Sequence, residues 1–207
     1  MLFRSRPTHA SSPWDAAKFE VCAHRWAHVG EPGYGVAVAN DSTYGHDLRR
    51  GAREGGGTFT TVRLSLLRAP RFPDPDTDQG RHEMRYALVA GASIADAIEA
   101  GYQLNLPPRV AVGGSGVDPL VTVGEGVVVE AVKLADDGSG DVVVRLYEAL
   151  GRRSRTRLEA GFPVRSVSET DLLERPKTTE ALLSFDDGGA DLALRPFQIV
   201  TLRLTVG

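Results

Sequence analysis

Hydrophobic and polar residues alternate along most of the chain, which is the pattern of half-buried β-strands. The alternation runs through residues 19–29, is followed by an apolar run at residues 35–39, and continues through residues 58–67, 84–89, 127–135, 141–150 and 197–206. The turn-forming pair Asn40-Asp41 follows the second run. The sequence therefore predicts an all-β protein built as β-sandwiches.

One segment has the period of a helix. Ser93 is a suitable N-cap, and the segment LNLPP at residues 104–108 ends the pattern. The positions expected on its buried face are Ile94, Ala97, Ile98 and Gly101 or Tyr102. At most one short helix is expected.

A glycine-rich segment at residues 110–119 breaks the periodicity, so we place a boundary there and expect two lobes, residues 1–113 and 114–207. In the second lobe, DDGSG joins the runs 127–135 and 141–150 into a hairpin. The residues expected to oppose each other across it are Val128, Val132 and Leu134 with Val142, Val144 and Leu146. The run 197–206 is expected to close a small sandwich.

Composition narrows the class of protein. A length of 207 residues with 42% hydrophobic residues suffices for a core, and 23 glycines with 12 prolines favour turns over long helices. The net charge of −3 argues against a nucleic-acid partner, and the basic segment 151–157 is interpreted as a solvated turn. Neither a membrane-spanning run nor the apolar core of a signal peptide is present, and the single cysteine, Cys22, is compatible with a cytoplasmic location.

Seven ordered blocks resemble the C-terminal region of the α-mannosidases of glycoside hydrolase family 38. They are RPTH, WDAAKFEVCAHRWA, EPGYG, NDSTYGHD, SLLRAP, PDPDTDQGRH and LNLP, and they cover nearly all of residues 6–108. Farther on, VVVRLYEALG, SVSETDLLE and LRPFQIVTLRL resemble the small β-sandwich that ends these enzymes. The chain departs from the family at Ser42-Thr43, where many members carry a lysine, so no cation is expected at this position.

The resemblance implies retaining hydrolysis of α-mannosides by a parent enzyme, whose zinc ion and aspartate nucleophile belong to an upstream barrel without counterpart here. It implies that residues 1–113 form part of a larger mutarotase-like sandwich and that residues 114–207 form the small terminal sandwich. No catalytic or metal residue is expected in this chain, and the chain alone should be inactive. An incomplete first sandwich would expose an apolar face and a strand edge, so a homo-oligomer is expected.

The resemblance also implies that this region packs on the catalytic domain and lends side chains to the rim of its active site. Loops 40–47 and 68–82 are the expected source, because loops carry recognition while strands carry packing. The residues expected at the rim or at a domain contact are Tyr44, His46, Asp47, Arg68 and His82. Within the first loop, Asn40, Asp41 and Gly45 should shape the turn from which Tyr44 and His46 project.

Other chemistry fits the sequence less well. Asp74, Asp76 and Asp78 follow the start of a calcium loop, but the glycine and the bidentate glutamate of an EF-hand are missing. Their carboxyl groups are also the candidates for an independent glycosidase pair. His24 and His28 would lie about 13 Å apart in one strand, too far for a shared metal ion.

Two non-enzymatic alternatives remain: a carbohydrate-binding sandwich and a scaffold for dimerisation. Trp14, Trp26, Tyr34 and Tyr44 are the aromatic residues available to stack on a sugar. Trp26 and Tyr34 are expected in the core, which leaves Tyr44 as the better candidate.

Overall fold

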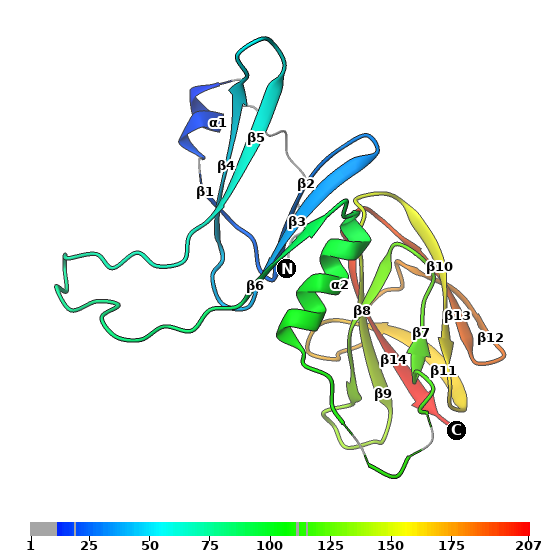
Figure 1. Ribbon diagram of the computed structural model, residues 1–207. Coiled ribbons are helices and arrows are strands. Elements are labelled where there is room, and N and C mark those ends of the chain that lie inside the picture. The colour runs from blue at the N-terminus through cyan, green and yellow to red at the C-terminus, as the bar shows by residue number, and fades with distance from the viewer. Residues whose placement is uncertain (1–11, 19, 111, 115) are drawn as a thin grey trace. The chain divides into compact units, whose positions relative to one another are not determined.

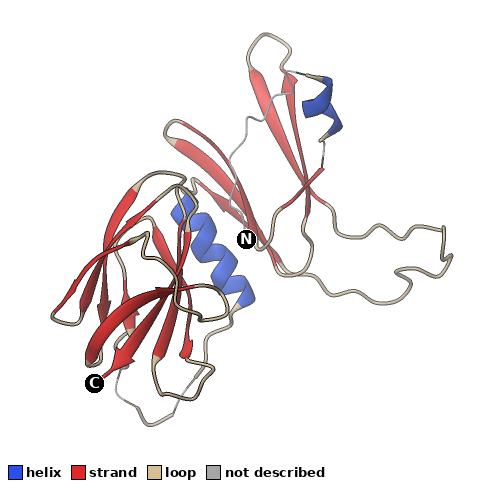
Figure 2. Cartoon of the chain, turned by 180° about the vertical axis from the view of Figure 1, so that it is seen from behind, coloured by secondary structure: helices blue, strands red, loops and turns tan. Residues whose placement is uncertain are grey.

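The computed structural model describes residues 12–18, 20–110, 112–114 and 116–207 (Figure 1). The chain divides into two compact units, Arg6–Val110 and the part that follows Val110. The expected boundary between residues 113 and 114 falls in the same glycine-rich segment. Strands dominate both units (Figure 2), which confirms the all-β fold class.

The first unit contains six strands and two helices in its described part. They are α1 (Pro13–Ala17), β1 (Glu20–Cys22), β2 (Trp26–Glu31), β3 (Tyr34–Asn40), β4 (Gly45–Ala52), β5 (Thr58–Leu64), β6 (Tyr86–Ala90) and α2 (Ile94–Asn105). The strands form two antiparallel sheets, in the orders β1-β4-β5 and β2-β3-β6. Helix α2 packs on one face of the second sheet, where Ala97 joins Ala37 and Ala92 in a small buried cluster.

The single strand expected over residues 19–29 is wrong, because the chain changes sheet in its middle. β1 pairs with β4, whereas β2 pairs with β3. Arg25, between them, has a left-handed φ of 69°. Its carbonyl accepts a hydrogen bond from the Asn40 N–H at 2.9 Å, and its guanidinium lies 4.8 Å from the centre of the Tyr102 ring. These distant contacts hold a backbone conformation that alternation cannot reveal.

The expected helix is present as α2. The Ser93 side chain accepts a hydrogen bond from the Asp96 N–H, and the Asp96 carboxylate accepts one from the Ser93 N–H, which forms a capping box. Gly101 lies against Trp26, where an added Cβ would come within 2.9 Å of the indole Cδ1. α1 exceeds the expected helix count; Ser12 caps this single turn, and Pro13 stands at its start.

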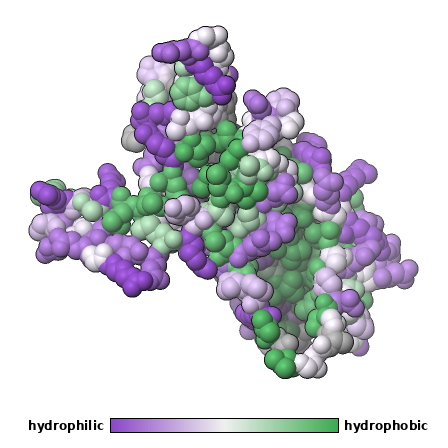
Figure 3. All heavy atoms as spheres, viewed as in Figure 1, coloured by the Kyte–Doolittle hydropathy of each residue, from purple (hydrophilic) through white to green (hydrophobic). Residues whose placement is uncertain are grey.

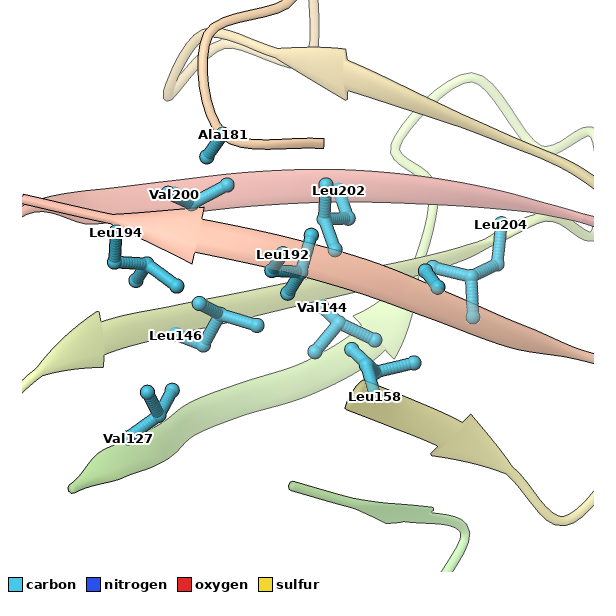
Figure 4. Close-up of a cluster of buried hydrophobic side chains, with 11 residues drawn as sticks. Val127, Val144, Leu146, Leu158, Ala181, Leu192, Leu194, Val200, Leu202 and Leu204 are labelled. Carbon is cyan, nitrogen blue, oxygen red and sulfur yellow. The ribbon is translucent and has the colours of Figure 1, made fainter. Parts of the chain in front are cut away.

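The second unit is a sandwich of two four-stranded antiparallel sheets, β12-β13-β10-β7 and β11-β14-β9-β8. Its strands are β7 (Val121–Thr122), β8 (Val127–Leu134), β9 (Val142–Glu148), β10 (Ser154–Ala160), β11 (Val164–Thr170), β12 (Leu182–Asp186), β13 (Gly189–Leu194) and β14 (Ile199–Val206). Leucine and valine side chains from both sheets meet in the buried core (Figure 4). β14 pairs with both β9 and β11, as expected of a closing strand.

The predicted hairpin is formed by β8 and β9, but its register differs in part. Val132 lies opposite Val144 as expected, whereas Val128 lies opposite Tyr147. The pairing shifts between Val129 and Ala131, with Glu130 as the additional residue of β8. An extra residue of this kind forms a β-bulge and moves every pair beyond it by one position.

Candidate functional site

The turn between β3 and β4 is held by an aspartate–arginine clasp. The Asp41 carboxylate accepts hydrogen bonds from the backbone N–H and the side-chain Nε of Arg85, each at 3.0 Å. These bonds, the backbone one first, lower the pKa of Asp41 below its ordinary value. The clasp fixes the segment that carries Tyr44 relative to the start of β6.

Tyr44 is partly exposed and is held from two sides. Its side chain is packed edge-on against the His24 ring, with the ring centres 5.0 Å apart, and the residue is 42% exposed. Its carbonyl accepts a hydrogen bond from the Ala23 N–H at 2.8 Å. Tyr44 is therefore partly accessible to solvent while its ring packs against His24.

His46 is buried, which contradicts the expectation that it projects from a loop. It lies in β4 between Val21 and Leu64 of the neighbouring strands, and Gly45 is likewise part of that strand. The ring Nδ1 lies 3.1 Å from the Tyr44 carbonyl oxygen and donates to it in the matching tautomer. Burial lowers the pKa of His46, and the Tyr44 carbonyl partly opposes this effect. The neutral ring is therefore favoured.

Asp47 is also in β4, and it is paired with arginines of its own sheet. Its Oδ2 forms ion pairs with Arg63 of β5 and with Arg49, the latter at 3.5 Å. Arg63 is not among the site residues that the sequence predicts. Its position on an alternating strand gave a signal, because Arg63 stands directly opposite Asp47 once β4 and β5 are paired.

Three buried polar atoms in this segment have no hydrogen-bond partner among the described residues: Asn40 Oδ1, His46 Nε2 and Asp47 Oδ1. Buried polar groups in proteins are nearly always satisfied, so each such atom calls for an explanation. The segment 40–47 therefore retains hydrogen-bonding capacity that a water molecule or an incoming polar group would use.

The loop 68–82 makes its own contacts. The Asp78 carboxylate accepts a hydrogen bond from the Ala69 N–H at 3.0 Å, and the His82 Nε2 lies 2.8 Å from the Asp78 carbonyl oxygen. Arg68 is exposed. Among the described residues, no hydrogen bond or ion pair joins Arg68 or His82 to the β4 residues. The structure thus brings Tyr44, His46 and Asp47 together and leaves the other two candidates in a separate loop.

The alternative metal sites are arranged for other contacts. His28 Nε2 lies 2.8 Å from the Ala92 carbonyl oxygen, while His24 packs on Tyr44. Asp74 accepts a hydrogen bond from the Asp76 N–H at 2.9 Å. Within the described ranges, no three His, Cys, Asp or Glu side chains are grouped to hold a metal ion.

The aromatic candidates divide between surface and core. Trp26 is half-buried against the small cluster under α2, as expected. Tyr34 was expected in the core but is 55% exposed, because it opens β3 directly after the turn at Gly33. Trp14, in α1, is exposed.

The β2-β3-β6 sheet has an apolar face turned away from α2. Ala37 points toward the helix, so its neighbours Val36 and Val38 point the other way. Val29 lies opposite Val36, and Leu88, which is 73% exposed, lies opposite Val38. Hydrophobic residues are visible at the surface over the strands of the first unit in Figure 3. We call this surface the open face; it consists of Ala27, Val29, Val36, Val38, Tyr86 and Leu88.

Comparison with known proteins identifies the class. The family described as "Glycosyl hydrolases family 38 C-terminal domain" matches residues 3–76, and the "Glycosyl hydrolases family 38 C-terminal beta sandwich domain" matches residues 126–202. The chain therefore belongs to glycoside hydrolase family 38 and corresponds to its non-catalytic C-terminal domains. In the described part of the chain, neither helix has the length and hydrophobicity to cross a membrane.

The curated relatives that this chain matches are much longer than the chain itself. It is 38% identical to human alpha-mannosidase 2C1 across 97% of its own length but only 19% of that protein, and 30% identical to the Saccharomyces cerevisiae alpha-mannosidase across 96% of its length and 20% of that protein. The crystal structure of an alpha-mannosidase from Enterococcus faecalis V583 has the same fold, with a TM-score of 0.64 at 21% identity over 96% of this chain and 22% of that one. The chain thus spans about a fifth of the length of these proteins.

Proposed function

We propose that this chain serves an α-mannosidase by packing against its catalytic domain, with an α-mannoside as the substrate of the whole enzyme. The observation that carries the proposal is the match of nearly the whole chain to about a fifth of the named mannosidases. The open face supports it, because a contiguous apolar surface usually marks a contact with another protein surface. Zinc and the nucleophile belong, in this proposal, to the catalytic domain.

The first test measures the chain alone. Purified protein is incubated with an aryl α-mannoside, with and without added divalent metal ions. We expect no turnover, because the described residues group no ligands for a catalytic metal and catalysis needs groups that stabilise the transition state. Turnover that disappears when Asp74, Asp76 and Asp78 are changed to alanine would instead make this chain a small glycosidase.

Tyr44 is the side chain we assign to the rim of the active site or to the domain contact. It is exposed, its ring is held by His24, and the unsatisfied polar atoms of His46 and Asp47 lie in the adjoining strand. In the enzyme that contains this chain, Tyr44→Ala should lower kcat/KM by about tenfold while changing unfolding by less than about 1 kcal/mol. Phe59→Ala is the matched control, since Phe59 is similarly exposed and lies on β5, outside the open face. A large loss of stability with normal activity per folded molecule would make Tyr44 a structural residue.

A second function, association of copies of the chain, is favoured by the open face. Two such faces buried against each other would remove Leu88 and its neighbours from water. Light scattering should show a dimer or larger oligomer, whereas a strict monomer at high concentration would contradict this role. Sugar titration of the chain separates either reading from a carbohydrate-binding module, which would bind free mannosides without the catalytic domain.

We place the protein in the cytoplasm on the strength of Cys22. The residue is a free, exposed cysteine, and exposed thiols persist in reducing compartments. Cell fractionation with an antibody against the chain tests this placement.

A further inference from the structure

The small sandwich carries a hollow of about 660 Å³ beside the start of β10 and the end of β13. Its lining residues are Arg153, Ser154, Arg155, Glu180, Ala193, Leu194 and Arg195. The paired residues Arg155 and Ala193 lie side by side on β10 and β13. Because the Ala193 side chain is short and the Arg155 side chain beside it is long, space remains above Ala193.

Strand alternation explains why arginines collect here. Ser154, Thr156 and Leu158 point into the sandwich and are buried. The residues between them must therefore point outward, which places Arg153, Arg155 and Arg157 in one row. Repulsion between the like charges of such a row destabilises the fold unless side chains or a ligand neutralise them.

Only part of this row of arginines is paired with acidic side chains. Arg157 has two partners, Asp186 at 2.5 Å and Asp191 at 3.4 Å. Arg153 and Arg155, by contrast, have no acidic partner among the described residues. The unpaired charges thus lie at the end of the row that borders the hollow.

The acidic residue of the hollow does not cancel this charge. Glu180 pairs with Arg195 at 2.7 Å and also lies 3.7 Å from Lys177. The lining therefore contains three guanidinium groups and one carboxylate, and that carboxylate is shared with a lysine outside the lining. An anion entering the hollow meets a net positive charge of two.

We propose that this hollow binds a phosphate group through Arg153 and Arg155, with Arg195 as a third contact. A guanidinium offers paired N–H donors that match two oxygens of a phosphate, and the phosphate dianion balances the two unpaired charges. The group can arrive as free phosphate or as the phosphate of a small sugar, since both present the same oxygens. The site is independent of the role proposed for the first unit.

The test titrates the 207-residue chain with inorganic phosphate, mannose 6-phosphate and mannose, at constant ionic strength made up with chloride. Isothermal calorimetry should show saturable binding of both phosphates with a dissociation constant of about 1 mM and no binding of mannose. The double variant R153Q/R155Q should weaken binding by at least about tenfold. R165Q is the matched control, because Arg165 is exposed on the other sheet of the same sandwich.

A further variant works in the opposite direction. Removing the charge of Glu180 with E180Q frees Arg195 and should tighten phosphate binding by about threefold. A gain of affinity cannot arise from misfolding, and thermal unfolding without phosphate checks that each variant is folded. Tighter binding of mannose 6-phosphate than of phosphate would assign the sugar as part of the ligand, and equal binding would assign phosphate alone. The absence of saturable binding, or unchanged binding in R153Q/R155Q, would overturn the proposal.

Discussion

The two units of this chain bury their apolar side chains in different ways. In the second unit, leucines and valines from two four-stranded sheets fill a shared core, with Leu146, Leu202 and Leu204 wholly buried. In the first unit, the buried cluster under α2 consists of the alanines Ala37, Ala92 and Ala97, and larger apolar side chains lie on the open face. A sandwich with both faces matched can be stable by itself, whereas a sheet with an uncovered apolar face gains from a partner.

Buried polar groups show the same contrast. The Glu148 carboxylate in the second unit accepts hydrogen bonds from the N–H groups of Leu150, Gly151 and Phe197, at 2.8–3.0 Å. Glu169 accepts three backbone N–H bonds in the same unit, although Thr170 Oγ1 beside it has no partner in the described part of the chain. The other unsatisfied atoms cluster in the segment 40–47 of the first unit. The described buried polar atoms without a partner thus lie mainly in the segment that carries Tyr44, which we propose to lie at the active-site rim or the domain contact.

Core truncation should separate the units most strongly. Leu202→Ala removes a buried side chain from the second unit and should cost about 2–5 kcal/mol of unfolding free energy. Leu88→Ala, on the open face, should cost less than about 0.5 kcal/mol. Urea denaturation measures the unfolding free energies, and hydrogen exchange assigns them to the two units. Equal costs would mean that Leu88 is packed in solution.

Glu148→Gln should have the next largest effect, about 2–3 kcal/mol, because an amide nitrogen would face backbone N–H donors. Burial opposes the charged form of Glu148, but the backbone N–H groups outweigh it and lower its pKa. The charged group therefore stabilises the fold above its unfolded pKa of about 4.5, and this contribution is lost as pH falls through the lower folded value.

Thermal unfolding across this acid range measures that loss, which the variant should lack. Glu159→Gln is the control, since Glu159 is exposed on β10. If both variants had the same stability and pH dependence, the buried carboxylate would not be a stabilising element.

His46→Gln tests the first unit, at a cost of roughly 1 kcal/mol above neutral pH. Because burial lowers the pKa of His46, its neutral form is favoured in the folded state. Stability is then full above the unfolded pKa of 6.5 and declines as pH falls through the folded value. Unfolding measured from about pH 8 to pH 5.5 should show a steeper loss for the unsubstituted chain. Parallel profiles would indicate that His46 is accessible to protons in the folded protein.

The smallest effect on stability is expected for charge placed on the open face. Tyr86→Lys with Leu88→Lys should change unfolding by less than about 0.5 kcal/mol per site yet dissociate any oligomer, because charged side chains oppose burial of that face. Light scattering measures the mass. Leu134→Lys, at an exposed position of the second unit, provides the control and should leave the mass unchanged.

The sequence by itself determined the elements whose signals are local. The turn DDGSG and the alternation around it predicted the β8-β9 hairpin, and Ser93 with its helical period predicted α2. The family blocks also identified the domain type, as the two family matches confirm. These features are readable because turn, cap and period each depend on a few neighbouring residues.

Tertiary structure decided what depends on residues far apart in the chain. Pairing with two different strands broke the run 19–29 at Arg25, and pairing on both sides placed His46 in a buried strand. The register of the β4-β5 pair places Asp47 opposite Arg63, and the sequence does not specify that register. Alternation states that one side of a strand is apolar, but the partner that covers that side, or leaves it open, is chosen by the packing of the whole fold.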